Sequence, residues 1–455
     1  MLGAAYAMRS QWHITKRVVA LVLILACHAL AQDRYLVRIH SSAVASFAQN
    51  HKLTLLGSPD NPANPAVGSI GPLPGSVRDL YIATLATGSQ AALTSIQNDP
   101  AVERVEANQK IGLPHGSTAA SSSPWRAAGS SIASIASYFG TTAWSAYLNQ
   151  PAAGIVRIPD AHQIATGAGT VAFIDTGVDF TNPVLAASLN LGWDFTNNTP
   201  GGWDFKPVQL NQSTTSILDS ESMVVLDQST TSILDQSTTS ILDGQHVTGD
   251  YGHGTMIAGI IHLVAPTARL LPVKAFGDDG ASDLGTILAA FYWAVDHGAN
   301  VINMSFSMSD YSKEFSNALD YAVSQGVITV ASTGNDGGQA MVYPAGYSQV
   351  MGVASTDNNN QRSSFSNYGN WVTVAAPGEG VISTYPGAQY AAGWGTSFSA
   401  PFVSGAAALL VQLNGNVNPN QAQKAISQAS PAGQGLGAGV LNLLQACSYE
   451  AAHSR

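Results

Sequence analysis

The sequence predicts an α/β protein with a doubly wound, mostly parallel sheet flanked by helices, preceded by a small α+β ferredoxin-like domain. Two patterns in the 455-residue chain carry this prediction. Beyond Trp144, continuous apolar runs alternate with helical stretches, which is typical of buried parallel strands joined by crossover helices. Before residue 112, strand-like and helix-like segments follow one another in a β-α-β-α-β order, which favours a ferredoxin-like module.

The chain opens with the features of a secretory signal. Basic residues precede an apolar run from Val18 to Leu25, and Ala29-Leu30-Ala31 places small residues at the two positions that a signal peptidase reads. We expect residues 1–31 to be a signal peptide and the mature protein to be extracellular or periplasmic. An N-terminal anchor and a lipoprotein signal that uses Cys27 are the alternatives, but the run is short for a membrane span. We expect no later stretch to be long and apolar enough to cross a bilayer.

Residues 32–111 form the predicted small domain, and a Ser/Ala/Gly-rich linker follows over residues 112–137. The linker's composition predicts an exposed segment that proteases can reach, and therefore a processing site. Within the small domain, alternating apolar residues predict strands at Tyr35–Ile39, Leu80–Leu85 and Val102–Glu106, with helices at Ala43–Asn50 and Ser89–Gln97.

Residues 138–447 form the predicted larger domain, and we expect residues 448–455 to be a C-terminal tail. Ligands in doubly wound sheets bind beyond the carboxyl ends of the strands, so polar residues that follow strands are candidates for a site. Apolar runs predict strands at Thr170–Ile174, Leu270–Val273, Val301–Met304, Val327–Ala331 and Val350–Ala354, and helices at His253–Val264, Leu284–His297, Ser312–Gln325 and Phe402–Leu413.

Four octads tile residues 212–243 without a gap. The octad Gln-Ser-Thr-Thr-Ser-Ile-Leu-Asp starts at Gln212, Gln228 and Gln236, and a diverged copy occupies Ser220–Asp227. One interpretation is a β-rich flap or small solenoid beside the active site, with Ca²⁺ bound by the Asp that ends each octad. The other is a repeat expansion tolerated in a surface loop. We favour the second, because carboxylates at fixed spacing bind Ca²⁺ only where they converge with other oxygens.

The composition excludes some classes of function. Charged residues make up 10% of the chain and the formal net charge is −10, so no basic stripe is present to bind nucleic acid. The cysteines, Cys27 and Cys447, are too few for a disulfide scaffold, and only Cys447 lies outside the expected signal peptide.

Two residues are candidates for an acid–base pair. Asp175 directly follows the strand that ends at Ile174, so its carboxylate would be held at the carboxyl edge of the sheet. His253 lies in Gly-His-Gly-Thr ahead of a predicted buried helix, and its flanking glycines allow a sharp turn and the close approach of another segment. Taken alone, Asp-Thr-Gly is also typical of a turn, and a single His is more often structural.

Two further residues suit a nucleophile and its supporting amide. Ser397 lies in Gly-Thr-Ser-Phe-Ser-Ala-Pro before a small-residue helix, whose free N–H groups favour negative charge. Asn335 follows a buried strand, where its amide could point at a developing oxyanion alongside the Ser397 N–H. The alternatives are a helix N-cap for Thr396 or Ser397 and an ordinary turn residue for Asn335.

These segments, in the order Asp, His, Asn, Ser, resemble the subtilisin-like serine proteases (the subtilase, or peptidase S8, family) over roughly residues 155–445. Residues 34–111 resemble the family's inhibitor I9-type propeptide. The resemblance implies a secreted serine endopeptidase made as an autoprocessed zymogen, whose propeptide assists folding and inhibits the enzyme intramolecularly. The expected partners are protein or peptide substrates and the chain's own propeptide. We expect a monomer, with no nucleic acid and no stable membrane insertion after signal cleavage.

The resemblance also assigns roles to the candidate residues. Ser397 would attack the scissile carbonyl, His253 would take and return the proton, and Asp175 would orient His253. Asn335 and the Ser397 backbone N–H would form the oxyanion hole. The substrate groove would be lined by Ser305, Phe306, Ser307, Ser332, Thr333 and Gly334.

The sequence departs from the family's pattern at several positions. Phe398 stands where the family commonly has Met, Met256 where it often has His, and Ser307 where Gly is frequent. The His253 helix runs straight into the next strand, so the family's usual calcium-binding loop is not expected. The chemistry requires no cofactor, and no metal site is predicted; structural Ca²⁺ is left open without a recognisable site.

Three other functions fit parts of the sequence. The chain could be an inactive binding module of the same fold, an adhesion or structural protein in which the octads are the working part, or an esterase or peptide ligase that uses the same acyl-enzyme. All the polar catalytic candidates are present, which favours the peptidase.

Overall fold

The computed structural model of this chain describes residues 32–56, 68–73, 79–113, 135–204, 224–227 and 250–454. The chain divides into two compact units after Asn108. Residues 109–113 thus belong to the larger unit, whereas we expected the small domain to end at residue 111. The predicted signal peptide, most of the linker with its processing site, and the three identical octads lie outside the described residues.

The smaller unit is a sheet with two helices packed on one face. Its elements are β1 (Gln32–Ile39), α2 (Val44–Asn50), β2 (Thr54–Leu55), β3 (Ser69–Pro72), β4 (Leu80–Ala86), α3 (Gln90–Gln97) and β5 (Val102–Ala107). The strand order is β2-β3-β4-β1-β5, with β1 antiparallel to both β4 and β5. Val37 and Tyr81 on the sheet pack with Phe47 of α2 and Ile96 of α3. The ferredoxin-like prediction is confirmed, and the short strands β2 and β3, absent from that prediction, complete one edge.

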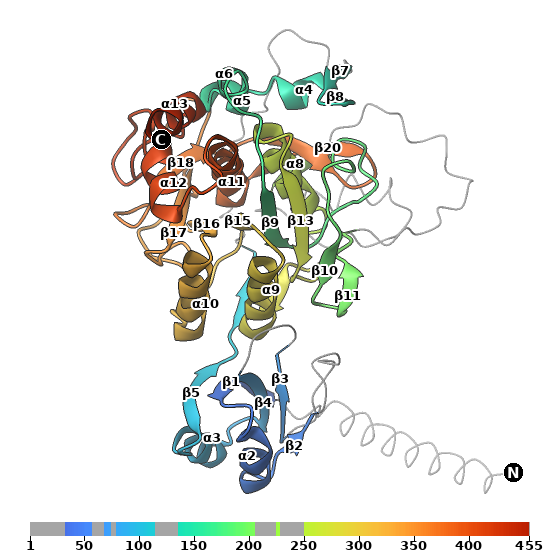
Figure 1. The fold of residues 1–455 in the computed structure, drawn as a ribbon, viewed down its shortest axis with the longest axis vertical. Helices are drawn as coiled ribbons and strands as arrows, with labels where there is room; N and C mark the ends of the chain where they lie inside the picture. Colours follow the sequence, from blue (N-terminus) through green and yellow to red (C-terminus); the bar gives the residue numbers. More distant parts are fainter. Residues whose placement is uncertain are drawn as a thin grey trace, which may run out of the picture. The chain divides into compact units, whose positions relative to one another are not determined.

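The larger unit is built on an eight-stranded sheet (Figure 1). Its strands are β9 (Thr170–Asp175), β10 (Gly192–Asp194), β11 (Thr199–Gly201), β13 (Arg269–Lys274), β15 (Val301–Met304), β16 (Ile328–Ser332), β17 (Val350–Thr356) and β18 (Val374–Pro377). They lie in the order β11-β10-β13-β9-β15-β16-β17-β18, and every neighbouring pair is parallel except β10 with β11. The five predicted strands are confirmed.

Helices cover both faces of this sheet, as predicted for a doubly wound fold. On one face, α8 (His253–Val264) and α11 (Thr396–Leu413) pack together in a core that includes Phe173 and Val330 of the strands. On the other, α9 (Leu284–Asp296) and α10 (Lys313–Ser324) lie side by side (Figure 1). The two helices contact each other through Phe291 and Phe315, whose ring centroids are 5.4 Å apart.

Helix α11 is long and apolar enough to cross a membrane by length and mean hydropathy (1.3), contrary to the expectation that no later segment would be. Because 83% of its apolar window is buried inside the unit, it has the setting of a core helix in a globular protein. Helices α12 (Pro419–Ile426) and α13 (Leu443–His453) follow it. Residues 448–453, which we expected to be a tail, therefore continue α13.

A smaller three-stranded sheet leads into α11. The strands β19 (Val381–Tyr385) and β20 (Gln389–Trp394) form an antiparallel hairpin, and β12 (Val224–Asp227) pairs with β20 in parallel. Because β12 is the end of the diverged octad, one repeat unit contributes an edge strand to the hairpin that precedes Ser397. The choice between a flap and a tolerated expansion stays a prediction.

His262 is a buried imidazole in the middle of α8. It is 3% exposed, its ring lies edge-on against Tyr138 with centroids 5.5 Å apart, and neither ring nitrogen has a hydrogen-bond partner among the described residues. Burial lowers the pKa of His262 to about 4. The folded protein therefore holds this imidazole neutral at a pH where an exposed His would be charged.

We predict that the free energy of unfolding falls as the pH drops from about 6.5 toward 4, because only the unfolded chain then protonates His262 readily. Above about pH 6.5 the His262 imidazole is neutral in both states and does not lower the free energy of unfolding. By pH 4, protonation of His262 in the unfolded chain has lowered the free energy of unfolding by about 3 kcal/mol. Denaturant unfolding of His262→Leu at several pH values should show a flatter profile over this range. His297→Leu, at an exposed His, is the control; a profile for His262→Leu as steep as the parent's would contradict the prediction.

Candidate active site

The candidate residues gather where neighbouring parallel strands end. Asp175 is the last residue of β9, Ser305 directly follows β15, and Asn335 comes shortly after β16. Because β15 lies between β9 and β16, the three strands bring these residues to one edge of the sheet.

Asp175 and His253 form a buried pair at this edge. Nδ1 of His253 lies 2.8 Å from Oδ1 of Asp175, and the two side chains are 4% and 0% exposed. The carboxylate oxygen also accepts the Thr176 N–H at 2.8 Å. Since an ionised carboxylate can only accept, the proton of the neutral imidazole sits on Nδ1. Nε2 is then an acceptor, and this buried atom has no hydrogen-bond partner among the described residues.

Two glycines allow helix α8 to approach β9 closely. Gly252, the N-cap of α8, has φ 85°, and a Cβ there would lie 2.3 Å from the Tyr385 ring. A Cβ at Gly254 would lie 2.0 Å from the Gly177 carbonyl oxygen and 3.1 Å from Oδ1 of Asp175. The glycines on both sides of His253 are therefore required by backbone conformation and space, as the sequence predicted.

The surroundings of His253 favour its charged form. Burial lowers its pKa, but the charge and hydrogen bond of Asp175, together with the charges of Asp250 and Asp204, raise the pKa above its ordinary value. Asp204 accepts a hydrogen bond from the Thr255 hydroxyl at 2.9 Å, and burial raises the pKa of this carboxyl. A base that gains a proton during a reaction benefits from such a carboxylate environment.

Ser397 is the second residue of α11 and is fully buried. Gly395, with φ 149°, is the N-cap, so neither Thr396 nor Ser397 has the N-cap role considered as an alternative. The Ser397 hydroxyl donates to the Ser305 carbonyl oxygen at 3.3 Å rather than to His253. The Phe398 ring lies 5.6 Å from the His253 ring, so the first turn of α11 adjoins the imidazole.

Asn335 is anchored to the residue before Ser397. Its Oδ1 accepts both the Thr396 N–H at 2.9 Å and the Thr396 hydroxyl at 2.8 Å, and the residue is 2% exposed. The Gly334 N–H in turn donates to the Thr396 hydroxyl at 3.2 Å. The turn after β16 and the start of α11 are thus joined through one side-chain amide, whose oxygen is fixed toward Thr396.

An extended segment of the chain lies beside this edge, within the larger unit. Strand β6 (Lys110–Gly112) pairs antiparallel with β14 (Ala281–Asp283), and Gly112 also bridges Ser307. The Leu113 N–H donates to the Gly280 carbonyl at 3.1 Å. The segment is therefore a middle strand between the loop after β13 and the loop after β15. Ile111 and Leu113 are buried, whereas Lys110 and Gly112 are exposed.

The predicted groove residues have different surroundings. Ser307 pairs with the extended segment, and Ser305 exchanges hydrogen bonds with Ser397. Phe306 is buried with its ring 5.3 Å from that of Phe276. The Thr333 hydroxyl donates to the Val353 carbonyl at 3.1 Å, so this side chain is turned toward β17. Ser332 is buried at the end of β16.

Some residues of this edge were missed at the level of sequence. Gly280 and β14 hold the extended segment but follow a strand in an Asp-Asp-Gly-Ala-Ser run that is typical of any surface turn. Lys274, at the end of β13, is buried and donates to the Thr176 carbonyl and to Asp278. Strand β13 lies beside β9 in the sheet, so residues at and after its carboxyl end reach the same edge as Asp175. This position is the signal that could have identified Lys274 and the segment of Gly280 and β14.

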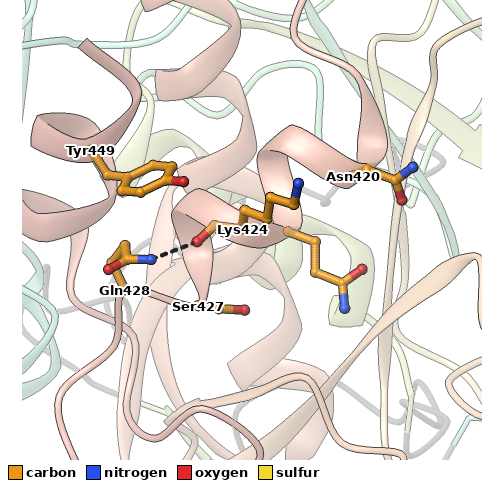
Figure 2. Close-up of a pocket in the computed structure, with 6 residues that line it drawn as sticks. Asn420, Lys424, Ser427, Gln428 and Tyr449 are labelled. Carbon is orange, nitrogen blue, oxygen red and sulfur yellow. Dashed lines mark hydrogen bonds between the residues drawn. The ribbon is translucent and has the colours of Figure 1, made fainter. Parts of the chain in front are cut away.

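A separate surface hollow lies between α12 and α13 (Figure 2). Lys424, Ser427, Gln428 and Tyr449 line it, and the Gln428 amide donates to the Lys424 carbonyl at 3.1 Å. None of the candidate catalytic residues lines this hollow. Over the described part of the chain, no three His, Cys, Asp or Glu side chains gather in a group that could hold a metal ion.

Comparisons with known proteins agree with this architecture. The model of the Subtilase family matches residues 167–444. The thermophilic serine proteinase of Bacillus sp. (strain AK1) is 34% identical over 285 residues, which cover 61% of this chain and 61% of the relative. Thermitase of Thermoactinomyces vulgaris is 34% identical over 266 residues, which cover 56% of this chain and 79% of thermitase.

A solved structure gives the same fold. Fervidolysin from Fervidobacterium pennivorans, described as a keratinolytic enzyme related to subtilisin, aligns with a TM-score of 0.64 over 92% of this chain and 61% of its own. At 21% identity this likeness concerns the fold alone. The chain spans 61% of the length of the Bacillus proteinase and, in a shorter match, 64% of subtilisin BL from Lederbergia lenta.

The doubly wound sheet, with a polar cluster at the carboxyl ends of β9, β15 and β16, defines a subtilisin-like α/β protein. Because the family model matches more than half of this chain, the chain belongs to the subtilase family.

The Asp175–His253 contact makes a prediction about proton affinity. Asp175→Asn removes the negative charge that raises the pKa of His253 but leaves the burial that lowers it. We therefore expect the imidazole pKa to fall, as measured by NMR titration of the ring resonances in a Ser397→Ala background. Asp310→Asn, at an exposed carboxyl, should leave the titration unchanged. An unaltered His253 titration in Asp175→Asn would show that the pair does not interact as described.

Proposed function

We propose that this chain is a serine endopeptidase that hydrolyses peptide bonds in proteins through an acyl-enzyme, with Asp175, His253 and Ser397 as its catalytic triad. The observation that carries the proposal is the buried Asp175–His253 hydrogen bond, which leaves Nε2 of His253 beside the first turn of α11 with no partner among the residues that the structure describes. Membership of the subtilase family supports the same assignment.

In the proposed reaction, the Ser397 hydroxyl turns from the Ser305 carbonyl to Nε2 of His253 and attacks the scissile carbonyl carbon. His253 takes the hydroxyl proton and then gives it to the leaving amine, which leaves an acyl ester on Ser397. Water activated by His253 hydrolyses this ester. Asp175 holds the tautomer and stabilises the imidazolium, in agreement with the raised pKa of His253. No step requires a cofactor.

The oxyanion of the tetrahedral intermediate would be bound by the Asn335 side-chain N–H and the Ser397 backbone N–H. The Asn335 oxygen is held by two donors of Thr396, which fixes the amide plane next to Ser397. The Ser397 N–H belongs to the first turn of α11, where no residue of the helix can accept from it. Donors fixed before the reaction stabilise developing charge without reorganisation, and one such donor is typically worth about 3–4 kcal/mol, in subtilisins among others.

The substrate would bind as an added strand between β14 and residues Ser305–Ser307. The segment 109–113 supports this proposal, because it makes main-chain pairs with both walls. Main-chain pairing accepts many sequences, as an endopeptidase of proteins requires. Ser332, Thr333 and Gly334 would form the neighbouring wall, mainly through their backbone.

We also propose that the chain is a secreted zymogen. Residues 1–31 would direct export and be removed. The small unit would be an inhibitory propeptide, and residues 109–113, which follow it within the larger unit, would occupy the groove. The burial of Ile111 and Leu113 supports such a role, because an occupied groove excludes other peptides. Processing in the linker would then release a monomeric catalytic domain.

The first test is the loss of the nucleophile. Ser397→Ala should abolish release of a chromogenic peptide by the processed protein, because the proposed acyl-enzyme forms on the Ser397 hydroxyl. Ser399→Ala, which removes a buried hydroxyl two residues along the same helix, should retain most of the activity. Hydrolysis by Ser397→Ala at a rate near that of the parent would overturn the proposed function.

The second test concerns the groove. Ile111→Glu places a charge at a position that is 3% exposed, which is costly without a partner. The intact precursor should then cleave a chromogenic peptide faster than the parent precursor, with processing followed on gels. Lys110→Glu, at the adjacent exposed position, should change the rate little. Equal rates for both variants and the parent would argue against inhibition by this segment.

A further inference from the structure

The helix that carries Ser397 lacks one of its own hydrogen bonds. In a continuous α-helix the N–H of residue i+4 donates to the carbonyl of residue i. Four residues after Ser397 this position is Pro401, which lies inside α11 and has no N–H. The Ser397 carbonyl is buried and so needs a donor from elsewhere in the fold.

Ser305 supplies that donor. Its hydroxyl lies 2.9 Å from the Ser397 carbonyl oxygen, and the Ser397 hydroxyl in turn reaches the Ser305 carbonyl at 3.3 Å. Both residues are fully buried. The end of β15 and the first turn of α11 are therefore joined by two reciprocal serine-to-carbonyl hydrogen bonds.

A buried relay sets the direction of the Ser305 hydroxyl. The Asn303 side-chain amide donates to the Ser305 oxygen at 2.9 Å, so the single Ser305 proton is left for the Ser397 carbonyl. The Ser404 hydroxyl donates to Oδ1 of Asn303 at 2.8 Å, a shorter contact than its alternative with the Ala400 carbonyl at 3.3 Å. The hydrogen bond from Ser404 holds the amide oxygen of Asn303 toward Ser404, so the amide nitrogen faces Ser305.

We propose that Ser305, Asn303 and Ser404 are positioning residues for the nucleophile, acting through the Ser397 carbonyl that Pro401 leaves without a donor. The inference rests on the proposed function, because it concerns the residue assigned as nucleophile. The relay holds the Ser397 backbone in place. The position of this backbone sets where the Ser397 hydroxyl and the oxyanion-binding N–H lie. Its effect is on the chemical step rather than on substrate affinity.

A merely structural role would give a different result. A hydrogen bond that only satisfies buried polar groups stabilises the fold. Its loss would lower the thermal midpoint without a specific effect on kcat. A positioning role makes kcat fall by more than any loss of stability explains while KM stays nearly unchanged, because an enzyme whose nucleophile is displaced by a fraction of an ångström still binds substrate.

Ser305→Ala tests the donor itself. We expect kcat for a chromogenic peptide to fall about tenfold, equivalent to about 1.4 kcal/mol, with KM within about twofold of the parent. Thr356→Val is the matched control, because it removes a buried hydroxyl at the end of nearby β17 that has no hydrogen-bond partner in the part of the chain that the structure describes. Its kcat should match that of the parent.

Pro401→Ala supplies the rescue. It returns an N–H at the position that a regular helix uses to bond the Ser397 carbonyl. In the Ser305→Ala background it should restore most of the lost kcat, while the hydroxyl remains absent. It should also raise the thermal midpoint more in Ser305→Ala than in the parent, a comparison that needs no activity.

Asn303→Asp reverses the relay. At a pH where the introduced carboxyl is ionised it can only accept, so the Ser305 proton turns to it and leaves the Ser397 carbonyl. We expect a fall in kcat at least as large as that of Ser305→Ala, and no further fall when the two changes are combined. Ser404→Ala should have a smaller effect in the same direction, since it removes only the outer member.

The outcomes separate this inference from the proposed function. A parent that hydrolyses no peptide overturns the proposed function, and the thermal comparison then decides whether Ser305 replaces the missing helix donor. An active parent with an unimpaired Ser305→Ala variant overturns only the positioning role. The positioning role is also overturned if the loss of kcat is proportional to the fall in thermal midpoint and is not restored by Pro401→Ala.

Discussion

The hydrogen bond between His253 and Asp175 is the contact on which the rest of the site depends. It joins the end of β9 to the start of α8, and it exists only because glycines at 252 and 254 let the helix begin against the strand. With both side chains almost fully buried, the carboxylate fixes one ring nitrogen as donor and leaves the other as a buried acceptor. The geometry of the pair therefore leaves one ring nitrogen able to accept a proton, which is the role that the proposed mechanism gives it.

The start of α11 is held in place from two directions. On one side, Asn335 bonds Thr396 through its amide oxygen. On the other, Ser305 bonds the Ser397 carbonyl, whose helical donor is missing at Pro401. These contacts come from the ends of β16 and β15, so the sheet itself sets the position of the first helical turn. The Ser397 hydroxyl donates to the Ser305 carbonyl, and the proposed reaction requires this side chain to turn toward His253.

Much of this arrangement follows from local sequence. The strands that end at Asp175 and Met304 are continuous apolar runs, and their carboxyl ends must meet at one edge if they are neighbours in a parallel sheet. The glycines around His253 and the small residues after Ser397 identified the segments that approach most closely. Helix α8 was predicted with its observed bounds, because an apolar run interrupted only by His262 extends from Met256 to Val264.

Other features depend on contacts distant in sequence and could not be predicted. Nothing near Ser305 indicates that its hydroxyl replaces the donor missing at Pro401, since the partners are 92 residues apart along the chain. The pairing of Lys110–Gly112 with Ala281–Asp283 is equally remote, and both segments have compositions typical of loops. The raised pKa of His253 reflects carboxylates from several elements. The burial of His262 depends on Tyr138, the last residue of β7 (Ile135–Tyr138), which forms a hairpin with β8 (Thr141–Trp144).

The account is tested most directly by reaction of the processed protein with a fluorophosphonate, followed by mass spectrometry of its peptides. A nucleophilic hydroxyl deprotonated by His253 predicts a single phosphonylated residue, Ser397, and no labelling when His253 is replaced by Ala. Labelling at another residue, or labelling of Ser397 that does not depend on His253, would contradict the central claim.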